Sequence, residues 1–244
     1  MLYGLMPIND SAFKALTAVN ATDGSVVWQV TLPFTGYRDL GFSDSSDLTP
    51  LLITADAIYF HDLMTFMAFE RQNGSTRFSF TPPGNDTTNR FAAAFGPTLT
   101  TDGSVVFLSS IPYALWNLHP VSGAVQWSLD LRPFVGANYD GWVTPTRPKP
   151  VCAADGTLYI GDLAQAFTGV SSADASANYV LAVNSSTGEV RWILQASGLK
   201  SPVAIGKSGQ LYFASSTALV RVGQGERANC ASACYMFLLS LIHI

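Results

Sequence analysis

The chain has 244 residues, a formal net charge of −4, 12% charged residues and 48% hydrophobic residues. Its 13 basic residues are scattered, so it lacks the basic patch with which nucleic-acid-binding proteins hold phosphates. No apolar run approaches the roughly 20 residues that a membrane-spanning helix needs. We therefore expect no nucleic-acid partner and no membrane span in this chain.

A short repeat recurs along the chain, in which a glycine is followed four residues later by a large aromatic residue. Its four copies align without gaps and are residues 18–28, 68–78, 117–127 and 182–192. The glycines are Gly24, Gly74, Gly123 and Gly188, and the aromatic residues are Trp28, Phe78, Trp127 and Trp192. Glycine preceded by Asp, Asn, Ser or Thr favours a tight turn between antiparallel strands.

A second element alternates with the first. It begins near a proline, passes through a turn and continues into β-branched and aromatic residues, and its copies are residues 49–60, 96–107, 149–160 and 201–213. Together the two elements predict four short strands in each period of about 50 residues, the pattern of a propeller blade. We expect complete blades at about 47–80, 96–131 and 148–195, two strands of a blade before them and three after them.

The last copy of the first repeat carries a family resemblance at every position, through Ala182, Asn184, Thr187, Gly188, Glu189 and Trp192. It resembles the tryptophan-docking repeat of quinoprotein-type, or PQQ-like repeat, β-propellers, and the likeness extends over roughly residues 13–224. The other copies depart from the pattern at Phe78, Asn117 and His119. The resemblance implies an all-β propeller of four-stranded antiparallel blades. It also implies that the glycines and aromatic residues hold adjacent blades together and do not touch a ligand.

The same resemblance implies that the propeller is incomplete, with about three full and two partial blades, because propellers of this family have seven or eight. The last six residues, LSLIHI, match the in-frame translation of a sequencing-adapter end. We therefore interpret residues 1–225 as a partial propeller and 226–244 as an aberrant, non-native tail, the alternative for the tail being a short hydrophobic strand. A second alternative is a closed ring of four blades, in which the first and last strands share one sheet.

Residues with catalytic or metal-binding chemistry form no recognisable group. Quinoprotein dehydrogenases, which the repeat resembles, carry adjacent cysteines over the cofactor and acidic and amide ligands around calcium. No two cysteines are adjacent here, and Cys152 in a strand context is a small buried residue rather than a nucleophile. The histidines lack metal-ligand spacing. We predict no catalytic, cofactor or metal residue, and PQQ and calcium enter only if the chain is a fragment of an alcohol or sugar dehydrogenase.

Long connections are the remaining functional signal. From each docking aromatic residue to the next proline the chain runs 22, 19, 23 and 10 residues, and in a propeller such connections gather at one end of the central channel. Long loops on a rigid scaffold are where binding residues concentrate. The candidate ligand or partner residues in these loops are Arg38, Asp39, Arg90, Tyr139, Asp140, Trp142 and Arg147. The alternative is ordinary solvated loops.

Two further features bear on surface and location. Residues 162–179 lengthen one hairpin, and their Ala and Ser content is typical of a tolerated surface insertion. Asn-x-Ser/Thr triplets begin at Asn9, Asn20, Asn73, Asn85 and Asn184, which weakly favours a secreted, lumenal or periplasmic protein. The expected function is a non-catalytic binding or scaffold module whose protein or small-molecule partner contacts the loop-rich end.

Overall fold

The computed structural model describes residues 1–7, 14–32, 51–61, 65–83, 96–110, 112–135, 149–164, 177–197, 203–214 and 219–223. In these residues the chain forms short strands and one helical turn. In chain order they are β1 (Leu2–Pro7), β2 (Lys14–Val19), β3 (Val26–Thr31), β4 (Leu52–Ile53), β5 (Ala57–His61), β6 (Phe66–Glu70), β7 (Thr76–Phe80), β8 (Thr98–Leu99), β9 (Val105–Ser110), β10 (Tyr113–Leu118), β11 (Val125–Asp130), α1 (Arg132–Val135), β12 (Val151–Cys152), β13 (Thr157–Ala164), β14 (Ala177–Asn184), β15 (Val190–Ser197), β16 (Ala204–Ile205), β17 (Leu211–Ala214) and β18 (Leu219–Val222).

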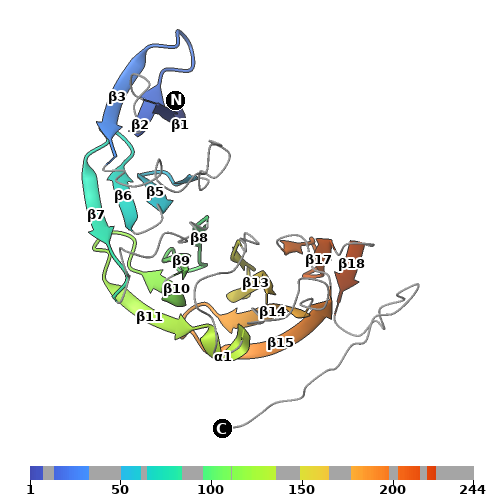
Figure 1. Cartoon of the computed structure of the whole chain (residues 1–244). Helices are drawn as coiled ribbons and strands as arrows, with labels where there is room; N and C mark the ends of the chain where they lie inside the picture. Colours follow the sequence, from blue (N-terminus) through green and yellow to red (C-terminus); the bar gives the residue numbers. More distant parts are fainter. Residues whose placement is uncertain are drawn as a thin grey trace.

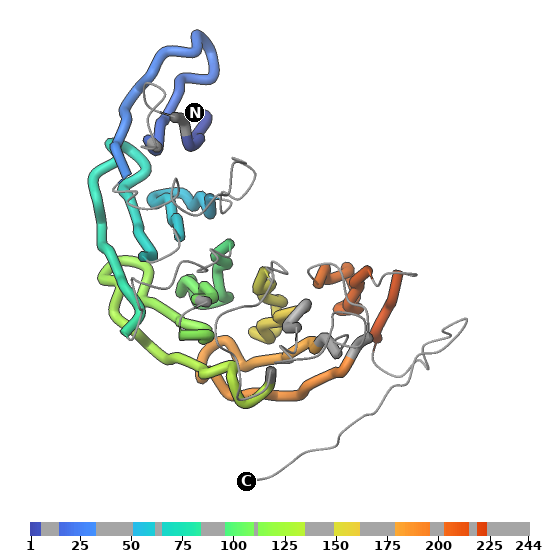
Figure 2. The backbone as a smooth tube through the Cα atoms, in the orientation of Figure 1, coloured from blue at the N-terminus to red at the C-terminus, as the bar shows by residue number. Residues whose placement is uncertain are grey.

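The strands form five antiparallel sheets, each a simple meander in chain order. We number them as blades: β1–β3 is blade 1, β4–β7 blade 2, β8–β11 blade 3, β12–β15 blade 4 and β16–β18 blade 5. Blades 2, 3 and 4 have four strands each, and blades 1 and 5 have three among the described residues. Figures 1 and 2 show the blades following one another along a curved arc. The predicted all-β architecture of four-stranded propeller blades is confirmed.

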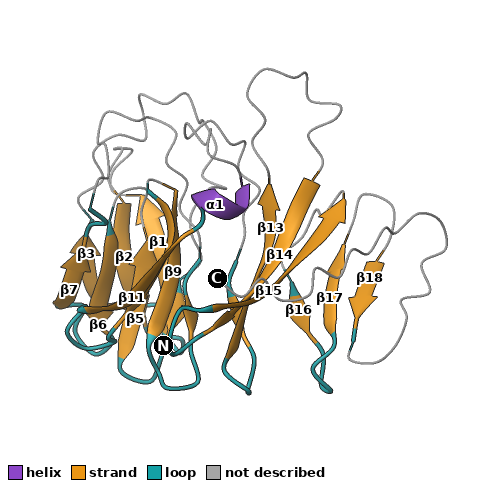
Figure 3. Cartoon of the chain, turned by 90° about the horizontal axis from the view of Figure 1, so that it is seen from below, coloured by secondary structure: helices purple, strands orange, loops and turns teal. Residues whose placement is uncertain are grey.

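The antiparallel meander sorts the connections onto two ends of the sheets. In blades 2, 3 and 4 tight turns join the first strand to the second and the third to the fourth, in blade 1 a tight turn joins β2 to β3, and Figure 3 shows these turns on the lower side. We call this side the turn end. The second-to-third hairpins of the four-stranded blades and the connections between blades leave from the opposite side, where Figure 3 shows α1, and we call it the loop end.

The turn between the last two strands has the same hydrogen bonds in every copy. In blade 2 the amide of Gly74 donates to the carbonyl of Glu70 (2.8 Å), and the amide of Glu70 donates to the carbonyl of Ser75 (2.8 Å). The turns around Gly24, Gly123 and Gly188 repeat this pair of bonds, and all four glycines have positive φ. The turn chemistry of the repeat therefore produces one backbone geometry despite different side chains.

A β-bulge follows each of these turns. In blade 2 the register pairs Phe69 with Thr76 and Ala68 with Phe78, so Arg77 has no partner across the ladder. The same shift occurs in blades 1, 3 and 4, one residue before the aromatic residue. A bulge re-aims side chains and ends regular pairing. Here it places one extra residue directly beside the docking aromatic residue of each blade.

The hydrophobic core lies between neighbouring blades, and we call each such contact a seam. Leu16 and Trp28 of blade 1 pack with Ile58, Phe60 and other residues of blade 2 in seam 1–2. Seam 2–3 is aromatic, with Phe66 and Phe107 stacked at a centroid distance of 4.4 Å. Seams 3–4 and 4–5 are mostly aliphatic. Burial of these faces is the main force that stacks the blades.

The structure differs from the sequence predictions at four places. Before the first complete blade lie three strands rather than two, because residues 2–7 pair with β2. The connection predicted from residue 133 onward begins with α1, and residues 162–164 and 177–179 of the predicted insertion extend β13 and β14. The four-bladed ring is also wrong for the described residues, since the first and last strands belong to separate sheets at opposite ends of the arc (Figure 1).

Candidate functional site

The loop end is where the sequence places the candidate binding residues. The predicted residues Arg38, Asp39, Arg90, Tyr139, Asp140, Trp142 and Arg147 all lie outside the described residues. The strands that flank their loops are described. Residues 33–50, 84–95 and 136–148 each connect the last strand of one blade to the first strand of the next, so all three depart from the loop end.

The third of these connections is anchored at its start. Leu131 is fully buried at seam 3–4, and Phe134 of α1 packs partly buried against the same core. The Arg132 guanidinium forms an exposed ion pair with Asp130, with Nη2 2.6 Å from Oδ2, and its hydrogen bonds lower the pKa of Asp130. The chain that carries Tyr139 and Trp142 therefore leaves from a fixed point on the seam.

The hairpin of β13 and β14 contributes to the same end. These two strands have eight residues each, compared with five or six for their counterparts in blades 2 and 3. Their second-to-third connection lies at the loop end by topology. The strands that flank this hairpin and the three long connections thus all meet them at the loop end of the sheets.

The turn end holds the docking contacts between blades. In seam 1–2 the indole of Trp28 lies so close to Gly74 of the next blade that a Cβ there would stand 2.6 Å from Cε3. Its Nε1 donates to the carbonyl of Arg71, at 3.2 Å. Arg71 in turn donates from Nε to the hydroxyl of Tyr3 (3.0 Å) and covers that ring at 5.5 Å. Blade 1 is therefore held to blade 2 by apolar packing and by hydrogen bonds donated from each blade to the other.

Seam 3–4 repeats this arrangement with one change. A Cβ at Gly188 would stand 2.9 Å from the Trp127 ring, and Trp127 Nε1 donates to the carbonyl of Ser185 at 2.9 Å. The same carbonyl accepts a second bond, from Nδ2 of the buried Asn117 at 3.1 Å. Asn117 Oδ1 is buried without a hydrogen-bond partner among the described residues. The departure from the repeat pattern at Asn117 thus adds a donor across the seam.

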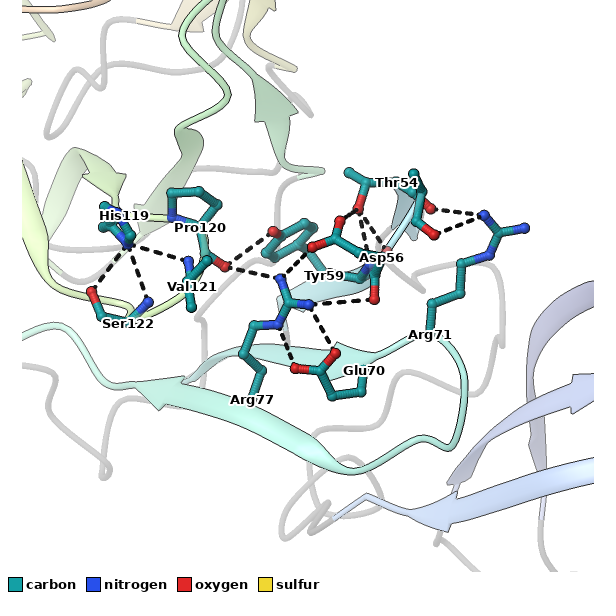
Figure 4. Close-up of polar contacts among 12 residues, drawn as sticks. Thr54, Asp56, Tyr59, Glu70, Arg71, Arg77, His119, Pro120, Val121 and Ser122 are labelled. Atoms are coloured by element: carbon teal, nitrogen blue, oxygen red, sulfur yellow. Dashed lines mark hydrogen bonds and ion pairs between the residues drawn. The ribbon is translucent and has the colours of Figure 1, made fainter.

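Seam 2–3 lacks the indole N–H. Phe78 packs on Gly123, where a Cβ would stand 2.5 Å from Cδ2, but a phenyl ring cannot donate to the carbonyl of Pro120. That carbonyl, three residues before the glycine as in the other seams, accepts instead from the Tyr59 hydroxyl at 3.2 Å and from Arg77 Nη1 at 3.5 Å. Figure 4 shows both groups directed at Pro120. Two side chains of blade 2 thus take over the contact that tryptophan makes elsewhere.

Arg77 is the bulge residue of blade 2 and the centre of a small ion-pair network (Figure 4). Its guanidinium forms two bonds of 2.8 Å to the Glu70 carboxylate and one of 3.0 Å to Asp56 Oδ2. Its side chain is 9% exposed, whereas those of Asp56 and Glu70 are 65% and 40% exposed. The bonds from Arg77 lower the pKa of Glu70, and those from Thr54 and Arg77 lower the pKa of Asp56. Both carboxylates therefore stay charged at neutral pH and hold Arg77 against the seam.

The last docking tryptophan, the half-buried cysteine and the histidines show no sign of a catalytic or metal-binding site among the described residues. Trp192 packs beside Tyr159, with a centroid distance of 5.7 Å, against the core of seam 4–5. Cys152 is a half-buried free thiol, and burial raises its pKa. Within the described parts of the chain, no three His, Cys, Asp or Glu side chains form a potential metal-binding group. His61 is buried beside Phe107, His119 is exposed in a turn, and His243 lies outside the described residues.

Sequence reasoning did not identify Tyr59, Arg77 or Asn117 as contact residues. A signal for the tyrosine existed, because Tyr3, Tyr59 and Tyr159 lie opposite the alanine that pairs with the docking aromatic residue in their blades. For Arg77 and Asn117 no local signal existed. Their bonds join residues 43 and 68 positions apart.

Comparison with known proteins agrees with this repeat geometry. A family described as outer membrane protein assembly factor BamB matches residues 12–228. The chain belongs to this family of PQQ-like repeat β-propellers. None of the curated proteins compared with the chain matches it. In the described residues no helix is long and apolar enough to cross a membrane.

Two solved structures show the same fold. BamB from Moraxella catarrhalis superimposes with a TM-score of 0.53 at 14% identity, over 90% of this chain and 56% of that protein. A protein of unknown function from Bacteroides caccae superimposes with a TM-score of 0.52 at 14% identity, over 93% of this chain and 70% of that one. The chain thus spans little more than half of the length of the BamB structure.

Proposed function

We propose that this chain is a non-catalytic scaffold module that contacts a protein partner through its loop end. The single observation that carries the proposal is that the strands flanking the three long connections and the β13–β14 hairpin all meet those segments at the loop end, while at the turn end the described residues form only tight turns. Long loops on a rigid frame are the usual place for recognition in propellers. Leu131 and Phe134, where the third connection begins, pack against the core of seam 3–4, so its starting point is fixed to the frame.

The family supports a partner in the cell envelope. The description of the family is that of an outer membrane protein assembly factor, so we propose the envelope as the location and a component of outer membrane protein assembly as the partner. The residues that we propose for the contact are Arg38, Asp39, Arg90, Tyr139, Asp140, Trp142 and Arg147. Aromatic and arginine side chains are the residue types that most often dominate the energy of protein interfaces.

The test exports the chain to the envelope of a Gram-negative bacterium, with a photo-crosslinking amino acid placed at one of two positions. One position is Trp142 in the third connection, and the other is Val121, which is 58% exposed at the turn end. We expect an adduct with an outer membrane assembly protein from position 142 and none from position 121. The double variant Trp142→Ala, Arg147→Ala, probed from position 139, should lose that adduct without a change in melting temperature.

Two results would contradict the proposal. Equal adducts from both ends would mean that the loop end is not the contact surface. Dye-linked oxidation of an alcohol or sugar by the purified chain, dependent on added PQQ and calcium, would instead identify a dehydrogenase. The two readouts are independent, so neither depends on success of the other.

A further inference from the structure

The docking turn of blade 2 contains the only Asn-Gly pair in the sequence, Asn73-Gly74. In such a pair the backbone nitrogen of glycine can attack the side-chain carbonyl carbon of asparagine. The N–C bond forms, the carboxamide nitrogen leaves as ammonia after taking up a proton, and a cyclic imide remains. Water then opens the imide to aspartate or isoaspartate. Asparagine is therefore a chemically labile residue, most of all before a glycine with no side chain to hinder attack.

In the folded turn, hydrogen bonds engage both reacting groups and so oppose the attack of the Gly74 nitrogen on the Asn73 side chain. The Gly74 N–H donates to the Glu70 carbonyl at 2.8 Å, so the nucleophilic nitrogen is engaged. The Asn73 Oδ1 accepts from the Ser75 amide at 3.0 Å and from the Ser75 hydroxyl at 2.8 Å, which fixes the carboxamide. Asn73 is nevertheless exposed, so water and base reach it freely. The turn must open before the nitrogen can attack.

Opening of this turn is coupled to seam 1–2. Gly74 lies directly under the Trp28 indole, and the Trp28 Nε1 holds the Arg71 carbonyl in the same turn. Movement of the Gly74 backbone toward the Asn73 side chain disrupts both contacts. The rate of the reaction therefore depends on how often blades 1 and 2 separate at the turn end.

We propose that Asn73 is a deamidation site whose reactivity is controlled by the docking of Trp28 on Gly74. While the seam is closed the site is protected, and each opening of the seam exposes it to imide formation. The isoaspartate product adds one methylene to the backbone between residues 73 and 74 and a negative charge to a turn that already carries Glu70. A glycine that must fit beneath an indole cannot accommodate the longer backbone, so the product disfavours re-docking.

The test measures deamidation at Asn73 by peptide mass spectrometry after incubation of the whole chain in mildly alkaline buffer. The same chain unfolded in urea provides the unprotected rate. We expect the folded chain to react about a hundredfold more slowly, the factor given by a local opening free energy of about 3 kcal/mol. Trp28→Ala should raise the folded rate by about tenfold or more, because truncation of an aromatic side chain packed at a seam costs more than about 1.4 kcal/mol, which corresponds to a tenfold change in rate.

Trp127→Ala is the matched control, since it removes the equivalent docking residue from seam 3–4 and leaves Asn73 untouched. It should not change the rate at Asn73. If Trp28→Ala fails to fold, the pair Trp28→Phe and Trp127→Phe replaces it, with about a fivefold increase expected only for the first, from loss of the Nε1 bond. Equal acceleration by both members of a pair, or a folded chain as fast as the unfolded one, overturns the proposal.

Discussion

At the residue scale, docking is a contact between a large flat side chain and a glycine of the following blade. The three docking-repeat glycines that lie under an aromatic ring of the preceding blade would each place a Cβ within 3.0 Å of that ring, whereas Gly24 of blade 1 would place one within 4 Å of no described atom. Only the absence of a side chain allows the ring to lie on the turn backbone. The ring then buries a large apolar area at the point where the two sheets meet.

Comparison of Gly24 and Gly74 separates the effect of backbone strain from the effect of close approach to an aromatic ring. Gly24 and Gly74 have nearly the same φ, +73° and +72°, so alanine at either position costs the same left-handed backbone strain, about 1 kcal/mol. Gly74→Ala additionally forces the Trp28 ring away. We expect Gly74→Ala to lower the free energy of unfolding by about 2 kcal/mol more than Gly24→Ala, measured by urea denaturation. Equal effects would show that the close approach has no energetic weight.

The docking residues were predictable because they recur at a fixed spacing within a local turn. The polar substitutes were not. Tyr59 and Arg77 reach the Pro120 carbonyl only because the bulge and the register of blade 2 bring them to the seam. A sequence pattern records that Phe78 stands where tryptophan is expected, but it does not record which other side chains supply the missing donor.

At the element scale, neighbouring seams use different means to satisfy the same carbonyl position. Seams 1–2 and 3–4 use an indole N–H, and the second of these adds Asn117. Seam 2–3 uses a phenol and a guanidinium and compensates with a stack of phenylalanine rings. Because a buried carbonyl without a donor is costly, loss of the indole requires a replacement of this kind.

The Arg77 network makes seam 2–3 sensitive to acid. The pKa values of Glu70 and Asp56 are lower in the folded chain than in the unfolded one, so their contribution to stability is present above the unfolded values, near pH 4, and is lost as the pH falls through the folded values. Arg77→Met should cost about 1 kcal/mol at neutral pH, a modest figure because both carboxylates are well exposed. It should also flatten the acid dependence of the free energy of unfolding.

The measurement is urea denaturation of the wild type and the variant at a series of pH values from neutral to below 4. Arg132→Met is the control, since it removes an exposed ion pair at the loop end that lies at no seam carbonyl. Because the bonds from Arg132 lower the pKa of Asp130, this variant should remove only the small acid-dependent contribution of that exposed pair and leave the contribution of the Arg77 network in place. A parallel pair of curves for wild type and Arg77→Met would contradict the assigned role of the network.

At the scale of the whole molecule, the described parts of the five blades follow one another along an arc (Figures 1 and 2). Each of the four hydrophobic clusters joins two consecutive blades. In such arrays stability is approximately a sum of unit and nearest-neighbour terms. Damage at one seam should therefore remain near that seam.

Hydrogen exchange can test this locality. Trp127→Ala should speed amide exchange in β8–β15, on both sides of seam 3–4, by about tenfold or more. The amides of β1–β3 should exchange at the wild-type rate, because no described contact links blade 1 to that seam. Uniform acceleration in all five sheets would instead show that the arc unfolds as a single cooperative unit.

The sequence by itself determined the local and periodic features of this protein: the strands, the tight turns, the blade period and the glycine and aromatic positions. These follow from turn chemistry and alternation within a few residues. Only the tertiary structure decided that β1 completes a third strand of blade 1, which glycine lies under which ring, and how Tyr59, Arg77 and Asn117 satisfy the seam carbonyls. The physical reason is distance along the chain: these cross-seam bonds join residues 43 to 68 positions apart, and they depend on sheet register and blade stacking, which no local pattern specifies.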